Sequence, residues 1–155
     1  MGGSVNGKVG MTASPQAAPE VAQGRVDAAP GYEGWEPWRL AELERDRFSG
    51  RVGMELVSVS DRVRVWSIDL PPGGRLPFHR HVLDYFWTCL SYGRARHHYG
   101  DGTILEVGHH PGETKHFKFA SGEHFVHDVE NIGDCNLVFT TVEFLDSENE
   151  PLPLP

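Results

Sequence analysis

The feature that most constrains the fold of this chain is a succession of short strand-like segments between residues 52 and 144. Turns rich in Gly, Pro, Asp and Ser separate these segments, and no stretch with helical periodicity interrupts them. Short, regularly spaced strands with glycine-rich turns are typical of a closed barrel or jelly roll. We therefore predict an all-β domain, with strands over 52–59, 62–70, 76–81, 84–92, 94–99, 103–107, 114–119, 123–130 and 136–144.

The segments that flank this series have a different character. Residues 1–31 contain no Leu, Ile or aromatic residue, so they bury too little apolar surface to offset their ordering entropy, and we expect a flexible, disordered tail. Residues 32–50 are expected to form a helical extension, because Pro37 suits a first helical turn and Trp38, Leu40 and Leu43 supply an apolar side. The barrel is predicted over 51–146, and the proline-rich 147–155 is expected to be a C-terminal tail.

Composition and charge exclude several classes of function. The net charge of −8 argues against a nucleic-acid partner, which requires a surplus of Lys and Arg. The apolar stretches are strand-sized, so no membrane span is expected, and the N-terminus lacks the apolar core of a secretory signal. Cys89 and Cys135 both lie in apolar runs and are expected to be buried reduced thiols, which suits a cytoplasmic protein.

Histidines carry the most informative pattern. His79 and His81 are two residues apart on a predicted strand, so their rings are expected to point to the same face. Two imidazoles on one face offer two neutral nitrogen ligands for a metal ion. Because the chain contains nine histidines, one such pair is weak support for a metal site by itself. The spacing of other residues around the pair strengthens the interpretation.

That wider spacing resembles the two motifs of the cupin superfamily. Gly74 is followed after four residues by His79-Arg80-His81 and then by Gly93, and His127 to Asn131 is followed by Gly133-Asp134. The resemblance covers residues 52–145, and within the superfamily it is most similar to small single-domain bacterial cupins associated with β-alanine degradation. It implies a single cupin β-barrel in which His79, His81 and His127 bind a divalent transition metal, whether Fe, Zn, Ni, Mn or Cu.

One position departs from the cupin pattern. The superfamily usually supplies a glutamate ligand where this chain has Phe86, and a phenyl ring cannot bind a metal. Asp84 has the same strand parity as Phe86, so it is expected to ligate the ion or to hydrogen-bond a ligand histidine. Two alternatives stay open. Three histidines and waters hold the ion, or the site is adapted so that metal is weakly bound or absent.

Further residues are assigned from the resemblance, from strand parity and from their position near turns. Tyr92 is expected to line the pocket and to be a candidate general acid, and Phe86 and Asn131 are expected pocket residues. Glu143 is favoured on the outer face, and His124 is also expected there. The pairs 97–98 and 109–110 are interpreted as surface histidines near turns, although one member of each pair could face a pocket.

Two classes of function follow from the resemblance. The first is a metal-dependent enzyme (an oxygenase, isomerase, decarboxylase or lyase) that acts on a small polar or carboxylate-bearing metabolite. The second is a non-catalytic small-molecule-binding or accessory cupin with a degenerate metal site. We expect a homodimer, because exposed sheet edges of such barrels are commonly covered by a partner.

Overall fold

The computed structural model describes residues 16–17 and 31–154. Its described elements are one helix, α2 (Pro37–Asp46), and ten strands. The strands are β1 (Gln16–Ala17), β2 (Glu55–Val59), β3 (Val63–Leu70), β4 (Arg75–His81), β5 (Tyr85–Cys89), β6 (Gly93–His98), β7 (Ile104–His109), β8 (Thr114–Lys118), β9 (Phe125–Asn131) and β10 (Leu137–Phe144). Every strand expected between residues 52 and 144 is present, so the all-β prediction is confirmed.

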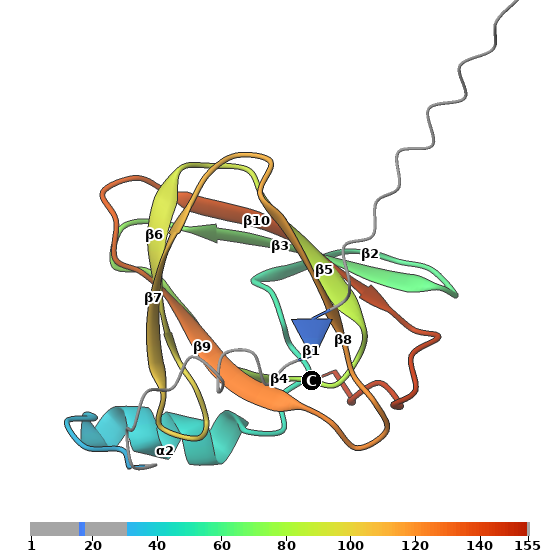
Figure 1. Cartoon of the computed structure of the whole chain (residues 1–155), viewed down its shortest axis with the longest axis horizontal. Helices are drawn as coiled ribbons and strands as arrows, with labels where there is room; N and C mark the ends of the chain where they lie inside the picture. The colour runs from blue at the N-terminus through green and yellow to red at the C-terminus, as the bar shows by residue number, and fades with distance from the viewer. Residues whose placement is uncertain (1–15, 18–30, 155) are drawn as a thin grey trace, which may run out of the picture.

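The strands form two sheets that curve around a common interior (Figure 1). One sheet has the order β1-β8-β5-β10-β3-β2 and the other the order β4-β9-β6-β7. Apart from the parallel pairing of the two-residue β1 with β8, the described pairs are antiparallel. This arrangement is a jelly roll, in which strands distant in sequence lie side by side.

The hydrophobic core lies between the two sheets. Its largest cluster combines side chains from both, namely Ile68, Leu70, Leu76, Cys89, Ala95, Val129, Leu137 and Phe139. A second cluster of Tyr85, Phe117 and Phe119 packs at another part of the interior. Because both sheets contribute, the interior is closed by side chains over part of its length and leaves a cavity over the rest.

Helix α2 packs outside the barrel, against the smaller sheet (Figure 1). Trp35 and Leu43 contact Phe78 of β4 and Val126 of β9 in a cluster of their own. Pro37 begins the helix, where its missing N–H is no loss, as the sequence predicts. The expected tail at 1–31 lies outside the described residues, except for residues 16, 17 and 31.

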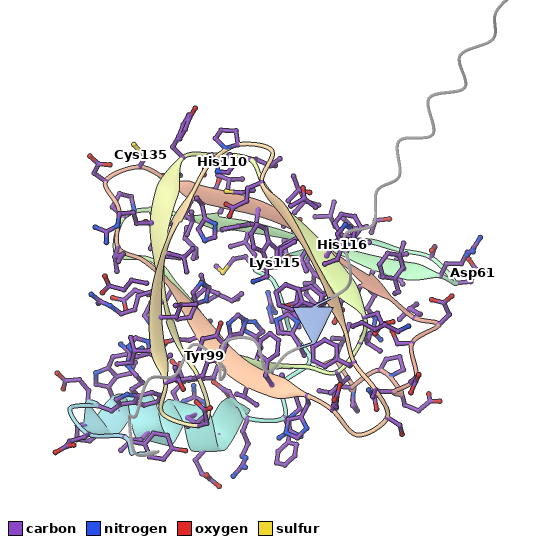
Figure 2. All side chains as sticks on the ribbon, viewed as in Figure 1. Asp61, Tyr99, His110, Lys115, His116 and Cys135 are labelled. Atoms are coloured by element: carbon purple, nitrogen blue, oxygen red, sulfur yellow. The ribbon has the colours of Figure 1, made fainter. Side chains whose placement is uncertain are left out.

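The two cysteines differ in their environment. Cys89 is fully buried in the core, whereas Cys135 is exposed in the loop between β9 and β10 (Figure 2). The prediction of two buried thiols is therefore wrong for Cys135, because the apolar run that follows it begins only at Leu137. Both thiols are free, as expected. Among the described residues no helix has the length and apolar character needed to span a membrane.

Candidate metal centre

Two neighbouring antiparallel strands bring three histidines together. His79 of β4 lies opposite His127 of β9, and His81 stands two residues further along β4 on the same face. The register of this pair shifts between Leu76 and His79. A β-bulge at this point keeps Leu76 directed to the core although it is three residues from His79, an odd spacing that would otherwise place it on the outer face.

The reactive nitrogens of these histidines meet at one point. The Nε2 atom of His81 lies 3.1 Å from that of His79 and 3.2 Å from that of His127. All three side chains are buried. Among the His, Cys, Asp and Glu side chains of the described residues, these three form the group whose ligand atoms lie close enough together to bind one metal ion. The Nδ1 atom of His79 lies 2.8 Å from the Pro77 carbonyl, to which it donates, so its Nε2 carries a lone pair.

Burial keeps these imidazoles neutral. Desolvation lowers the pKa of His79 to about 4. The pKa values of His81 and His127 lie well below the usual value, because of desolvation first and then of the neighbouring histidines. A neutral imidazole is the form that binds a metal, so the site does not have to lose protons near neutral pH before binding.

The three histidines form part of the wall of a cavity of about 140 Å³. Its lining is largely aromatic and apolar, with a few polar groups, as is usual for a small-molecule site. The polar and aromatic members are His79, His81, His127, His97, His109, Glu113, Lys115, Thr141, Tyr85, Tyr99, Trp87, Phe117, Phe125 and Phe139. On β8, Lys115 points toward the barrel interior and its neighbour His116 points away from it (Figure 2).

Two cavity histidines were interpreted from the sequence as surface residues, which is wrong. His97 is half-buried, and its ring stacks on His127 with 5.2 Å between centroids and 7° between planes. Desolvation, followed by the nearby His109, lowers the pKa of His97 to about 4. His109 is also buried, and of the pair at 109–110 only His110 is exposed. Being close to a turn does not place these histidines on the surface. The alternation of side chains in β6 and β7 continues to the ends of both strands and directs His97 and His109 into the cavity.

The predicted roles of Asp84 and Phe86 are also wrong. The carboxylate of Asp84 accepts a hydrogen bond from the backbone N–H of Phe119 at 2.8 Å and does not line the cavity. Phe86 contacts His116 on the outer face, with 5.1 Å between ring centroids and 35° between ring planes. The parity was counted across residues 82–84, which are not in a strand, so Tyr85 and Trp87 face the cavity instead.

Tyr92 and Asn131 lie outside the cavity lining as well. Tyr92 is 73% exposed in the turn that precedes β6, so it is no general acid for this cavity. Asn131 is buried, but its amide nitrogen donates to the carbonyls of Leu70 and Cys135, and its Oδ1 accepts from Gly133. Its role is to satisfy backbone groups where β9 ends.

Glu143 is buried rather than exposed, contrary to the favoured interpretation. Its carboxylate accepts a hydrogen bond from the indole N–H of Trp66 at 2.9 Å. Burial raises the pKa of Glu143 to about 7, against the lowering effect of that hydrogen bond. It does not line the cavity, but it is a buried acid that changes charge near neutral pH.

A buried charge cluster under helix α2 escaped the sequence analysis. Asp128 is fully buried and accepts from Arg39 of α2, from Arg75 of β4 and from His98 of β6. Arg75 also binds Glu42 of α2 at 2.9 Å. Asp128 follows His127 in β9 and therefore points to the opposite face. Burial alone would raise the pKa of Asp128, but the hydrogen bonds from His98 and Arg75 lower it.

The donor set fits a divalent transition metal. Three neutral imidazole nitrogens, with that of His81 at 3.1 and 3.2 Å from the other two and all within 4.8 Å of one another, suit ligand bonds of about 2.0–2.1 Å to one ion. Among the described residues no carboxylate joins this group, and the hydrogen-bond contacts found for its Nε2 atoms there are with one another. His124 is exposed, as expected, and takes no part.

Comparison with known proteins supports the fold. No protein-family model matches the chain, and no curated protein is significantly similar to it. Among solved structures, a cupin domain from Bordetella pertussis is 26% identical, with a TM-score of 0.51 over 58% of this chain and 88% of that chain. A double-stranded β-helix protein from Klebsiella pneumoniae is 22% identical, with a TM-score of 0.47 over 65% of this chain and 77% of that one. A cupin superfamily protein from Desulfitobacterium hafniense is 15% identical, with a TM-score of 0.45 over 59% and 75%.

The jelly roll and the inward histidine triad define a cupin-type barrel. The chain has the fold of the cupin superfamily, and the Bordetella cupin domain is the similarity on which this statement rests. The narrower similarity to cupins associated with β-alanine degradation stays a prediction.

Proposed function

We propose that His79, His81 and His127 bind one divalent transition metal and that the protein acts on a small polar or carboxylate-bearing metabolite in the adjoining cavity. The single observation that carries this proposal is the meeting of three buried, neutral Nε2 atoms at 3.1 and 3.2 Å in the cavity wall. When bound, such an ion supplies a Lewis acid that attracts an anionic or carbonyl oxygen.

The residues around the triad would hold and shield the ligand. Tyr85 and Phe125 cover His81, with ring centroids 4.2 and 4.9 Å from its own. Tyr99 lies 5.3 Å from His127 by the same measure. These aromatic groups exclude water from the cavity, which strengthens polar contacts between the protein and a bound molecule.

Elemental analysis of protein made without a histidine tag tests the proposal. We expect close to one metal ion per chain in the wild type and almost none in His127→Ala. His124→Ala is the matched control, because this exposed histidine lies three residues away and contacts none of the triad through a described interaction. Wild-type protein that stays metal-free after incubation with Fe, Zn, Ni, Mn and Cu salts contradicts the proposal.

A second candidate, a non-catalytic small-molecule-binding cupin, is favoured by one observation. In the part of the chain that the structure describes, no carboxylate lies with the three histidines, and Tyr85 stacks on His81. Native mass spectrometry distinguishes the candidates, because the second expects a bound organic molecule without stoichiometric metal.

The homodimer also stays a prediction. The edge strand β2, where Val57 and Val59 are 59% and 58% exposed, is the surface to probe by analytical ultracentrifugation.

A further inference from the structure

A second polar group faces the same cavity at a distance from the triad. His109 ends β7, and Glu113 follows four residues later, after the turn that leads to β8. Both line the cavity, and the Nδ1 atom of His109 lies 2.8 Å from a carboxylate oxygen of Glu113. The side chain of His109 is 4% exposed.

This contact fixes the state of the imidazole ring. A carboxylate can only accept, so Nδ1 of His109 carries the hydrogen and donates it to Glu113. In the neutral ring Nε2 then presents a lone pair. That atom is buried and has no hydrogen-bond partner among the described residues. Trp87 and Phe139 stand at 88° to the ring, with centroids 5.4 and 5.0 Å away, and hold it in place.

A buried, unpartnered nitrogen needs an explanation, because leaving such a group without a hydrogen bond destabilises a fold. His109 has no structural bond that uses Nε2, and its other nitrogen is already oriented by a carboxylate. A group that is fixed on one side and open on the other is arranged to receive a hydrogen-bond donor from a ligand.

The position of His109 sets the shape of that ligand. His109 pairs with Gly93, and His97, which stacks on His127, stands four residues further along β6. At about 3.3 Å per residue, the backbone positions of these two pairs are about 13 Å apart along the strand, while the side chains of His97 and His109 both reach into the cavity. His109 and the triad come from different positions along the cavity wall, so one small molecule can contact them through different atoms.

We propose that His109, oriented by Glu113, is the second polar contact for the ligand and accepts a hydrogen bond from its hydroxyl group. With the proposed function, on which this inference rests, the ligand class becomes a small hydroxy acid. Its anionic end lies at the metal and its hydroxyl end at His109. The recognition is directional, because the lone pair of Nε2 accepts a donor and repels a second carboxylate.

The test compares matched probes on the metal-loaded protein by isothermal titration calorimetry. The probes are the ω-hydroxy acids from 3-hydroxypropionate to 6-hydroxyhexanoate, each paired with the fatty acid that lacks the hydroxyl. One hydrogen bond of ordinary strength predicts about three- to tenfold tighter binding of at least one hydroxy acid than of its partner. His109→Phe should abolish this preference and keep the affinity for the fatty acid.

Two further variants separate recognition from folding. Glu113→Gln should reduce the preference, since the ring loses its charged orienting partner. His124→Ala should retain it, because His124 is exposed and does not line the cavity. Independently of any variant, ¹⁵N NMR of the wild type should show His109 protonated at Nδ1 only. Its Nε2 signal should move with the hydroxy acid and not with the fatty acid.

The two proposals fail in different ways. Protein that binds metal through the triad but distinguishes no probe pair, or a His109→Phe variant that keeps the preference, overturns the role of His109 alone. A ring protonated at Nε2 and not at Nδ1 overturns it as well. Protein that binds no metal overturns the proposed function and, with it, the hydroxy acid as ligand.

Discussion

The ring of His81 lies nearly flat on the ring of Tyr85, with 4.2 Å between centroids and 17° between planes. Tyr85 begins β5, one residue before the position where the cupin resemblance places an acidic ligand. Burial raises the pKa of Tyr85 well above its usual value, so its side chain stays a neutral phenol. The group beside the triad is thus an aromatic cover and not an anion.

Replacing this cover by an acid should strengthen metal binding. In Tyr85→Glu a carboxylate next to His81 attracts the ion, and we expect about tenfold tighter binding, which corresponds to about 1.4 kcal/mol. Competition with a chromophoric chelator measures the change. Tyr85→Phe is the control and should bind as the wild type does, because the phenyl ring preserves the stacking. Equal or weaker binding by Tyr85→Glu would show that position 85 does not reach the ion.

The buried acid Glu143 should make stability depend on pH. In the unfolded chain it ionises near 4.5, and in the folded state at about 7. Between these values the folded state holds a proton that the unfolded state has lost, so the free energy of unfolding falls as the pH rises. The stability that the protonated Glu143 gives the folded state is therefore complete below about pH 4.5 and is lost as the pH rises through about 7.

Glu143→Gln removes this dependence and keeps an oxygen for the indole N–H of Trp66. Urea unfolding at several pH values should show that, between pH 4.5 and 8, the free energy of unfolding of the variant rises relative to that of the wild type by up to about 3 kcal/mol. Glu106→Gln, at an exposed position, should show no such trend. A constant difference between wild type and Glu143→Gln would mean that Glu143 ionises normally.

The charge cluster under α2 should be intolerant of losing its anion. Asp128→Asn leaves Arg39 and Arg75 without the carboxylate that both contact. Breaking a buried ion pair on one side costs about 3–5 kcal/mol, and we expect that loss in urea unfolding. Glu44→Gln, which breaks the exposed contact with Arg47, should cost less than about 1 kcal/mol. Similar stabilities for the two variants would rule out a structural role for Asp128.

The glycine at the start of β6 should also resist substitution. A Cβ atom at Gly93 would lie 2.8 Å from Cδ1 of Leu137, which is fully buried. Gly93→Ala should therefore destabilise the fold by about 1–3 kcal/mol through overpacking. Gly108→Ala on the neighbouring strand meets no atom within 4 Å and serves as the control in thermal unfolding. A Gly93→Ala variant as stable as the wild type would mean that Leu137 can move aside.

The sequence predicted the strands and the pairing of His79 with His81 because both depend on local periodicity, and it predicted His127 through the resemblance to the cupin motifs. His79 and His81 share a face within one strand, and the turns at 71–74 and 100–102 separate strands clearly. Asp84, Phe86 and Tyr92 were misplaced because alternation cannot be counted through residues that leave the strand. A single residue of error reverses the face of every side chain that follows.

The remaining features depend on contacts between distant segments. Asp128 gave no signal, since its partners Arg39 and Arg75 lie 89 and 53 residues away. His109 and Glu113 are close in sequence, but only the sheet register shows that they share a cavity with His127. Pairing between β6 and β9, which is not local, carries that information.

The contacts of Arg39 and Glu42 with the smaller sheet also bear on where this domain begins. A fragment that starts at the first barrel strand would retain Asp128 and Arg75 but lose the helical side chains that neutralise them. We therefore predict that the autonomous folding unit extends upstream to at least Trp35, whose ring packs on Phe78. The helix covers the outer face of the smaller sheet, and a chain trimmed to the jelly roll should yield insoluble protein.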